Sequence, residues 1–240
     1  NYAAAELGKT EELRRELMAN ISHDLRTPLT MIEGFAEMMR DLPSENTPEN
    51  AQVIVDEARY LSALVRDILD LSKLESGVQE MNPEPLNLTE SVRQMVQRYG
   101  ALCQSEGFTI RVEAGEDLWV LADALRLQQV LYNLVNNAIA YTGPDKLVRV
   151  RQVRKGDFAR IEVLDTGKGV APEDLPYIWS RYYRGGKPHK RATVGSGLGL
   201  NIVKGILDRY GLSYGVESKL GEGSTFWFEM PLAPDADEKE

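Results

Sequence analysis

The first stretch with a regular hydrophobic pattern runs from residue 13 to residue 42. Its apolar positions recur every three or four residues, the period of a helix with one buried stripe. They are Leu17, Ile21, Leu25, Pro28, Ile32, Phe35 and Met39. Prolines and turn-forming residues follow over 42–48, so the pattern predicts a long amphipathic helix that ends near Leu42 and a short loop after it.

A second regular pattern leads to about Gly77. Ile54, Leu61 and Ile68 fall seven residues apart, with further apolar residues at the seam positions between them. Two helices of about 30 residues joined by a short loop are typical of an antiparallel hairpin. Since one hairpin cannot cover the wide apolar stripes of both helices, we expect two chains to form a dimeric four-helix bundle.

The pattern changes after Gly77, where an extended, proline-containing connector leads to Pro85. Asn87 followed by Glu90 resembles a capping box, which predicts a helix to about Glu106. A later helix is expected to run from a cap at Asp123 to Tyr141.

Short alternating or apolar runs predict the strands. They are 108–112 and 118–121 on either side of a turn at Gly115, 147–153 with 159–164 as one hairpin, and 214–218 with 225–230 as a second hairpin. The acidic residues 233–240 are expected to be disordered. Helices mixed with mainly antiparallel strands predict an α+β fold in which the helical hairpin precedes an α/β sandwich.

Composition narrows the class of protein. The 240 residues carry a net charge of -9, which argues against a general binder of nucleic-acid backbone, and the hydrophobic share of 42% predicts an ordinary folded domain. The longest apolar run, 118–122, is too short to span a bilayer, so we expect a soluble piece. One cysteine, Cys103, favours a reducing compartment. A start at Asn1 without methionine suggests a segment of a longer chain.

His23 is the first candidate for chemistry. It lies two residues from both Ile21 and Leu25, so it points away from the buried stripe and toward water. Asp24 is its neighbour, and Thr27 shares its face. One interpretation is an ordinary surface histidine beside an acid. The other is a nucleophile, because a carboxylate bonded to one ring nitrogen makes the other more nucleophilic.

Glycines form the second group of candidates. Residues 165–169 (Asp-Thr-Gly-Lys-Gly) follow an apolar strand, and residues 195–200 (Gly-Ser-Gly-Leu-Gly-Leu) open a helix. Glycines at the start of a helix let backbone N–H groups approach a phosphate. The spacing matches neither the dinucleotide-binding pattern nor the P-loop.

Two asparagines lie one helical turn apart within the helix that ends at Tyr141. Asn133 and Asn137 fall on one face of an otherwise apolar helix. Their amides could simply bond to neighbouring backbone groups. Alternatively, their oxygens could be ligands for a hard cation such as Mg²⁺. The spacing alone does not choose between these two roles.

Taken in order, the motifs resemble those of the sensor histidine kinases of bacterial two-component systems. Residues 21–30 (Ile-Ser-His-Asp-Leu-Arg-Thr-Pro-Leu-Thr) are similar to the phosphoacceptor box of that family. Five further segments are similar to other boxes of the family. They are the asparagine box (131–142), the first glycine box (165–169), the aromatic box (178–184), the second glycine box (195–200) and the final glycine-rich hairpin (221–226). The resemblance covers about residues 13–232.

The resemblance implies a division into domains. Residues 1–12 would end an upstream linker or signalling helix, and 13–78 would form a dimerisation and histidine phosphotransfer domain. A connector, 79–85, would lead to a Bergerat-type ATP-binding catalytic domain over 86–232, followed by the tail 233–240. The fragment would be the cytoplasmic portion of a membrane-bound sensor kinase.

The resemblance also implies catalytic roles. His23 would accept the γ-phosphoryl group of ATP, Asp24 would orient and deprotonate the imidazole, and Thr27 would help to place a water for the reverse dephosphorylation. The kinase would then pass the phosphoryl group to an aspartate of a response regulator docked on the helical bundle, and it would also act as the phosphatase of that regulator.

Further roles concern the nucleotide. Asn133 and Asn137 would hold Mg²⁺ and the phosphates, Asp165 would accept a hydrogen bond from the adenine amino group, and Tyr141 would pack against the base. Glycines would bracket a mobile lid, about 170–196, whose cations neutralise the triphosphate. The remaining residues assigned to the nucleotide site are Gly167, Gly169, Arg181, Arg184, Lys187, Lys190, Arg191, Gly195, Gly197, Leu198, Gly199 and Thr225.

One departure from the family pattern motivates an alternative function. Ala140 stands where the family commonly has Lys or Arg, so one phosphate contact is missing. A pseudokinase that binds nucleotide weakly and acts as a scaffold or phosphatase is therefore one rival interpretation. A non-kinase ATPase of the same nucleotide-binding fold is the second, although His23 in a helical hairpin before the ATP domain argues against it.

Overall fold

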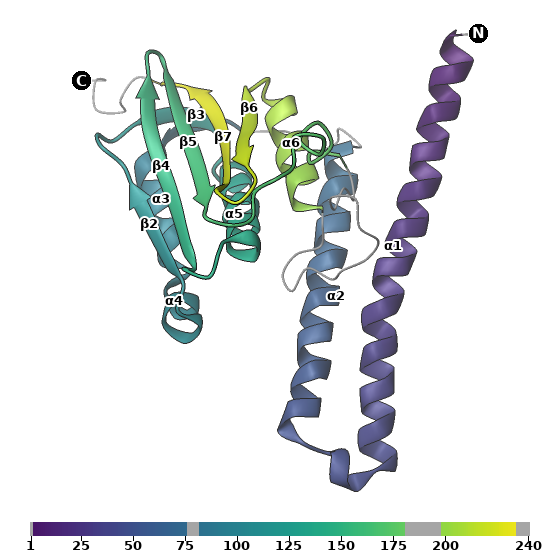
Figure 1. The fold of residues 1–240 in the computed structure, drawn as a ribbon. Helices are drawn as coiled ribbons and strands as arrows, with labels where there is room; N and C mark the ends of the chain where they lie inside the picture. Colours follow the sequence, from purple (N-terminus) through teal and green to yellow (C-terminus); the bar gives the residue numbers. More distant parts are fainter. Residues whose placement is uncertain (1, 76–81, 181–197, 234–240) are drawn as a thin grey trace. The chain divides into compact units, whose positions relative to one another are not determined.

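A long helical hairpin occupies the N-terminal part of the chain. The structure is a computed structural model that describes residues 2–75, 82–180 and 198–233. The chain divides into two compact units, residues 1–69 and 70–240. Helix α1 (Tyr2–Asp41) is followed by the single-turn helix η1 (Pro43–Glu45) and by α2 (Pro48–Glu75) (Figure 1). The predicted hairpin is confirmed, although α1 begins well before residue 13.

The hydrophobic stripe predicted for α1 is its least exposed face. Pro28 is buried, and the other stripe positions from Ile21 to Met39 are half-buried. On α2, however, Val55, Val65 and Leu69 are 40%, 43% and 54% exposed. At about 100° per residue these three side chains lie within an arc of about 80°. A single hairpin therefore leaves an apolar stripe of α2 open to solvent.

The helix predicted from Asn87 to Glu106 is divided in two. The Asn87 side chain accepts a bond from the Glu90 N–H and caps α3 (Leu88–Gln97), as the capping box predicted. The chain then breaks at Tyr99 before α4 (Gly100–Glu106). Gly100 weakens the helix locally. The Tyr99 hydroxyl also donates to the Asn136 side chain on α5 (Ala124–Tyr141) at 3.0 Å, so tertiary contact overrides helix continuity.

The second unit is built on a five-stranded sheet with the strand order β2-β4-β5-β7-β6. Three of its four pairings are antiparallel, and β2 runs parallel to β4. The two predicted hairpins are confirmed as β4–β5 and β6–β7. The strands are β2 (Thr109–Glu113), β4 (Leu147–Lys155), β5 (Phe158–Asp165), β6 (Tyr214–Lys219) and β7 (Gly223–Pro231).

A separate two-stranded ribbon was only half predicted. Strand β3 (Trp119–Ala122) pairs with β1 (Glu84–Asn87), which lies at the end of the segment expected to be a connector. The expectation failed because Pro85 has no N–H and reads as a strand breaker, yet proline is tolerated in an edge strand. Strands β2 and β3 flank Gly115 but belong to different sheets.

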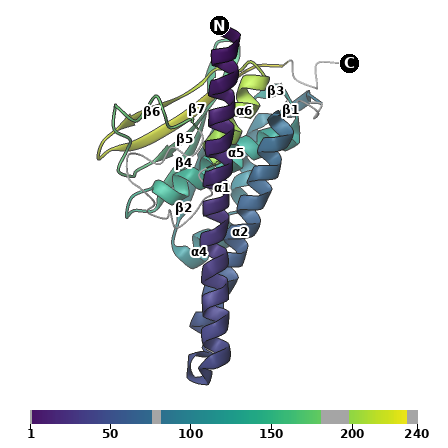
Figure 2. The ribbon, with the colours of Figure 1, turned by 90° about the vertical axis from the view of Figure 1, so that its right-hand side faces the viewer.

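Helices cover one face of the sheet and form the core with it. Helices α5 (Ala124–Tyr141) and α6 (Gly199–Arg209) pack against each other, and α3 packs against α5 and β2. Figure 2 shows the sheet and the helices α5 and α6 as adjoining layers. Alternate strand residues and one face of each helix are buried, among them Val92, Leu131, Leu134, Val150, Ile161, Ile202, Ile206 and Phe228.

The opposite face of the sheet carries a compact ionic cluster around Arg160. Its guanidinium lies 4.0 Å from the Trp227 ring and pairs with Glu162, Glu217 and Glu229 at 2.9–3.2 Å. Cross-strand pairs of this kind stabilise a sheet surface. Gly215 opposite Trp227 is required for the packing, since a Cβ there would lie 2.6 Å from the ring.

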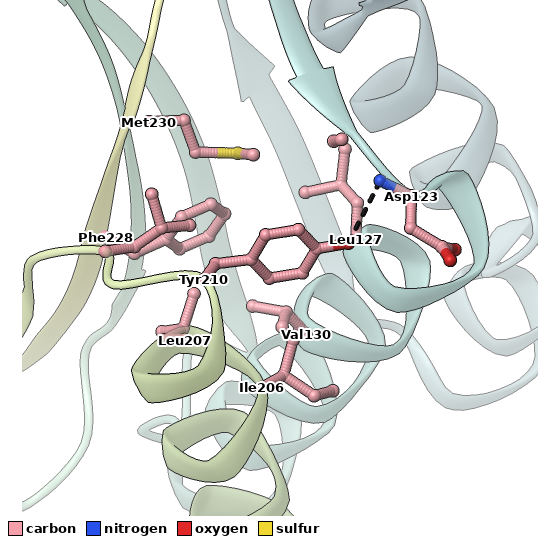
Figure 3. Close-up of a pocket in the computed structure, with 10 residues that line it drawn as sticks. Asp123, Leu127, Val130, Ile206, Leu207, Tyr210, Phe228 and Met230 are labelled. Carbon is pink, nitrogen blue, oxygen red and sulfur yellow. Dashed lines mark hydrogen bonds between the residues drawn. The ribbon is translucent and has the colours of Figure 1, made fainter. Parts of the chain in front are cut away.

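Helices α5 and α6 are joined at one end by a tyrosine. The Tyr210 ring extends from the end of α6 over a small cavity lined by Leu127, Val130 and Phe228 (Figure 3). Its hydroxyl accepts a bond from the Asp123 backbone N–H at 3.1 Å. Asp123 in turn caps α5 by accepting from two backbone N–H groups of the first turn. The bond therefore fixes the distance between the two helix ends.

Replacing Tyr210 by phenylalanine tests this link. Because the Asp123 N–H would lose its partner while the ring remains, Tyr210→Phe should lower the free energy of unfolding by about 1 kcal/mol. Urea unfolding followed by circular dichroism measures the change. Tyr132→Phe, at a tyrosine that is 56% exposed, is the control and should change stability by less than about 0.5 kcal/mol. Equal effects of the two substitutions would contradict the assignment.

Candidate functional site

His23 lies on α1 with its side chain toward solvent, as the sequence predicted. The imidazole is 55% exposed, and its Nδ1 lies 3.6 Å from Oδ1 of Asp24, whose side chain is only 12% exposed. A carboxylate on the Nδ1 side favours the tautomer with the proton there, which leaves the lone pair on Nε2. The arrangement is therefore suited to nucleophilic attack by Nε2.

Thr27 lies one turn beyond His23 on the same helix. Its hydroxyl donates to the His23 carbonyl oxygen at 3.2 Å, and the residue is exposed. Pro28 follows within the helix and lacks the N–H that would bond to the Asp24 carbonyl. The side chains of His23 and Thr27 therefore occupy one exposed part of the helical hairpin, with the less exposed Asp24 beside His23.

The asparagines of α5 are placed beside the start of α6. The Asn133 amide nitrogen donates to the Gln129 carbonyl at 2.9 Å, which turns its oxygen toward Gly199. A Cβ on Gly199 would lie 3.0 Å from that oxygen, so glycine allows the helices to approach here. Asn133 thus makes the backbone bond considered from its sequence and still directs an oxygen to the helix start. Asn137 is half-buried one turn further along α5.

Asp165 ends β5 and is only 6% exposed. Its carboxylate accepts a bond from the Gly167 N–H at 2.8 Å and others from the backbone and hydroxyl of Ser224. Burial raises the pKa of the Asp165 carboxyl, and these hydrogen bonds oppose that rise. The Asp165 carboxyl group is therefore a hydrogen-bond acceptor that is held in one orientation and largely shielded from solvent.

Glycines allow the loop after Asp165 to fit between its neighbours. A Cβ on Gly167 would lie 1.8 Å from the Tyr141 carbonyl oxygen at the end of α5. Gly169 has a φ of +68°, and a Cβ there would lie 2.1 Å from the Lys219 carbonyl oxygen. The loop is therefore wedged between α5 and the β6–β7 turn. Tyr141 remains 42% exposed beside it.

The structure corrects the expectation for Thr225. In the β5–β7 register Ser224 faces Asp165 and Thr225 faces Leu164, so the Thr225 side chain falls on the opposite face of the sheet. Ser224, which is buried, takes the position assigned to Thr225 and was missed from the sequence. Strict alternation along the strand from the buried Phe226 could have identified it.

Other expected residues divide between described and undescribed parts of the chain. Leu198 is buried at the N-terminus of α6, next to Gly199. In the aromatic segment, 178–184, the Trp179 ring packs edge-on against Tyr214 and Phe226, so the described part of this segment contributes to packing. Residues 181–197 lie outside the described residues, and these include Arg181, Arg184, Lys187, Lys190, Arg191, Gly195 and Gly197.

The second unit therefore brings several motifs to one site. Gly167 meets the end of α5 at Tyr141, and Gly199 meets Asn133 on the same helix. The amide oxygens of α5 suit Mg²⁺, which prefers hard oxygen ligands and commonly shares them with substrate phosphates. The described residues contain no cluster of three or more His, Cys, Asp or Glu that could hold a metal ion.

Two family models match the chain on either side of its connector. Residues 13–77 match the His Kinase A (phospho-acceptor) domain, and 122–234 match the ATPase domain of the histidine kinase, DNA gyrase B and HSP90 type. The chain belongs to the sensor histidine kinases. The resemblance drawn from its motifs is thereby confirmed, as is the predicted order of a helical hairpin and an α/β domain.

Individual sensor kinases support this membership. The sensor-like histidine kinase SenX3 of Mycobacterium tuberculosis is 34% identical over 97% of this chain and 57% of SenX3. The autoinducer 2 sensor kinase/phosphatase LuxQ of Vibrio parahaemolyticus is 30% identical over 97% of this chain and 28% of LuxQ. The histidine kinase ThkA, solved in complex with the response regulator TrrA, has a TM-score of 0.71 and 28% identity over 98% of this chain and 68% of that one.

This kinase chain thus spans little more than half the length of SenX3. Among the helices in the described part of the chain, none combines the length and apolar character that crossing a membrane requires.

The raised pKa of Asp165 predicts a pH-dependent effect of its replacement. Since the folded pKa lies above the unfolded value, keeping the carboxyl ionised in the fold costs stability at pH 7. Asp165→Asn should therefore have a Tm at least equal to that of the original chain at pH 7. The difference should shrink as the pH falls through the folded pKa toward the unfolded value of about 3.9, below which the carboxyl becomes protonated in both states.

Thermal unfolding without nucleotide from pH 7 to pH 4 measures this dependence. Asp157→Asn, in the exposed β4–β5 turn, is the control and should show no comparable trend. If the rise in Tm caused by Asp165→Asn instead grew as the pH fell, the upward direction of the Asp165 pKa shift would be wrong.

Proposed function

We propose that this chain is an ATP-dependent autokinase that phosphorylates His23. The observation that carries the proposal is the exposed imidazole held beside the Asp24 carboxylate in a phospho-acceptor domain. An ATPase domain with a buried acceptor, glycine turns and amide oxygens at one site supplies the second component. Together they support transfer of phosphate from ATP to histidine in two-component signalling.

The reaction uses the lone pair of His23 Nε2. This nitrogen attacks the γ-phosphorus of ATP and forms an N–P bond, while the bond from that phosphorus to the β,γ-bridging oxygen breaks and ADP leaves. Asp24 stabilises the positive charge that develops on the ring by accepting from Nδ1–H. Most of the rate enhancement comes from positioning and from neutralising charge on the transferred group.

Residues of the second unit hold the nucleotide in this proposal. Asp165 accepts a hydrogen bond from the adenine amino group, and Tyr141 packs against the base. The N–H groups at the start of α6, near Leu198 and Gly199, face the phosphates. Asn133 and Asn137 would hold Mg²⁺, which neutralises phosphate charge when bound. Lys and Arg residues within 181–197 would add further positive charge, in place of the cation that Ala140 lacks.

The proposed partner is a response regulator that receives the phosphoryl group on an aspartate. ThkA, of the same family, forms a complex with the response regulator TrrA, and LuxQ is named a kinase/phosphatase. By analogy, the helical hairpin would bind the regulator, and Thr27 would help to place the water for dephosphorylation. Two hairpins would pair through the exposed stripe of α2 to form a homodimer.

Labelling with γ-³²P-ATP and Mg²⁺ tests the kinase reaction. The chain should acquire a label that is stable in base and labile in acid, as a phosphohistidine is. His23→Gln should abolish the label without loss of folding, because the nucleophile is removed. Asn137→Ala should also abolish it by weakening the phosphate site.

Each alternative has its own signature in that experiment. A label that persists in His23→Gln would reject His23 as the acceptor. Phosphate release from ATP without phosphohistidine would favour a non-kinase ATPase. A folded dimer with neither nucleotide binding nor label would favour the pseudokinase. Asn136→Ala, beside Asn137 but bonded to Tyr99, is a control that should retain labelling.

Charge placed in the α2 stripe tests the homodimer. Val65→Glu would bury an unpaired carboxylate in the proposed interface, so it should raise the dimer dissociation constant by at least tenfold. Sedimentation equilibrium measures this constant. Ala63→Glu adds the same charge to an exposed position about 120° away from the centre of the stripe and should leave the dimer intact. Identical behaviour of the two variants would reject this stripe as the interface.

A further inference from the structure

A network of two serine hydroxyls lies behind the Asp165 carboxylate. Ser224 donates to Asp165 from its hydroxyl and its backbone. The Ser218 hydroxyl on β6 lies 3.0 Å from that of Ser224 and 2.9 Å from the Gly223 carbonyl oxygen, and its single proton is donated to one of them at a time. It also accepts the Val170 N–H at 2.8 Å. Ser218 therefore connects the support of Asp165 with the end of the first glycine loop.

Ser218 is hydrogen-bonded to the backbones of Gly223 and Val170, and a small shift of either backbone would move Asp165. Gly223 has a φ of +97°, and a Cβ there would lie 2.0 Å from the Asp165 carbonyl oxygen. Its backbone therefore touches the residue that presents the carboxylate. Val170 follows Gly169, which is packed just as closely on the Lys219 carbonyl. A hydroxyl that holds Gly223 and Val170 together thus fixes the Asp165 turn from both sides.

The fold around this network does not depend on Ser218 alone. The Gly221 N–H donates to the Lys168 carbonyl at 2.8 Å, and the β6–β7 ladder continues on either side of the Ser218–Ser224 pair. These are backbone bonds that a side-chain substitution leaves in place. Removing the Ser218 hydroxyl should therefore loosen the Asp165 turn without unfolding the sheet.

We infer that Ser218 is a positioning residue that sets the selectivity of the nucleotide site for adenine over guanine. The inference rests on the proposed function, in which Asp165 accepts from the adenine amino group. Guanine presents a carbonyl oxygen at the corresponding position, and a carboxylate repels it. This discrimination requires a carboxylate held in one place, because a loosened one can turn aside. Ser218 acts through Ser224 and Gly223 and does not itself touch the base.

Competition binding tests the inference on the whole chain. Displacement of the fluorescent analogue TNP-ATP by ATP and by GTP gives a Kd for each nucleotide. Ser218→Ala should reduce the ratio of GTP Kd to ATP Kd about tenfold, the value of one hydrogen bond, mainly through weaker ATP binding. Ser218→Thr, which keeps the hydroxyl and suits a strand, should restore the ratio. Ser213→Ala, at an exposed serine just before β6, should not change it.

The ratio separates positioning from a purely structural role. Equal weakening of both nucleotides, or an unchanged ratio in Ser218→Ala, would overturn the inference. If Ser218→Ala fails to fold, Ser218→Cys keeps nearly the same volume with a weak donor and should lower the ratio in the same direction. An original chain that binds neither nucleotide would refute the proposed function as well, whereas one that prefers ATP equally with and without the Ser218 hydroxyl would refute only the inference.

Discussion

The burial of one carboxylate organises the nucleotide-binding half of this kinase. Asp165 ends the central strand β5 at 6% exposure, and a carboxylate buried there needs hydrogen-bond donors. Those donors come from its own loop and from β7, while glycines let the loop touch α5 and the β6–β7 turn. One set of contacts therefore positions the Asp165 carboxylate, the glycine loop that follows it, and helix α5 with its two asparagines.

The histidine proposed as phospho-acceptor has the opposite environment. His23 is largely exposed on a helix, so its position relative to Asp24 comes from local geometry and not from a packed cavity. Such a group can meet more than one partner, which the proposed cycle of phosphorylation and transfer requires. In this proposal the preorganised groups lie in the ATP-binding unit, and the imidazole of His23 remains accessible.

Sequence patterns predicted most elements because each depends on local periodicity or capping. The seam of α1, the Asn87 and Asp123 caps and both hairpins follow from neighbours within a few residues. The elements that the sequence did not predict depend on contacts with residues far away in the chain. Tyr99 interrupts a helix because of Asn136 on α5, and β1 exists because β3 offers it a ladder despite Pro85. Ser224 and not Thr225 faces Asp165, because the register of β7 against β5 pairs Ser224 with it.

By itself, the sequence determined the family, the order of the two parts, the exposed His23 with its acidic neighbour and the glycine and asparagine motifs. These are properties of short segments and their order. Only the tertiary structure decided which motifs share a site, that Ser224 supports Asp165, and that Ser218 ties the first glycine loop to the final hairpin. The physical reason is that burial and hydrogen-bond geometry arise between strands distant in the chain, where a one-residue change of register exchanges one face for the other.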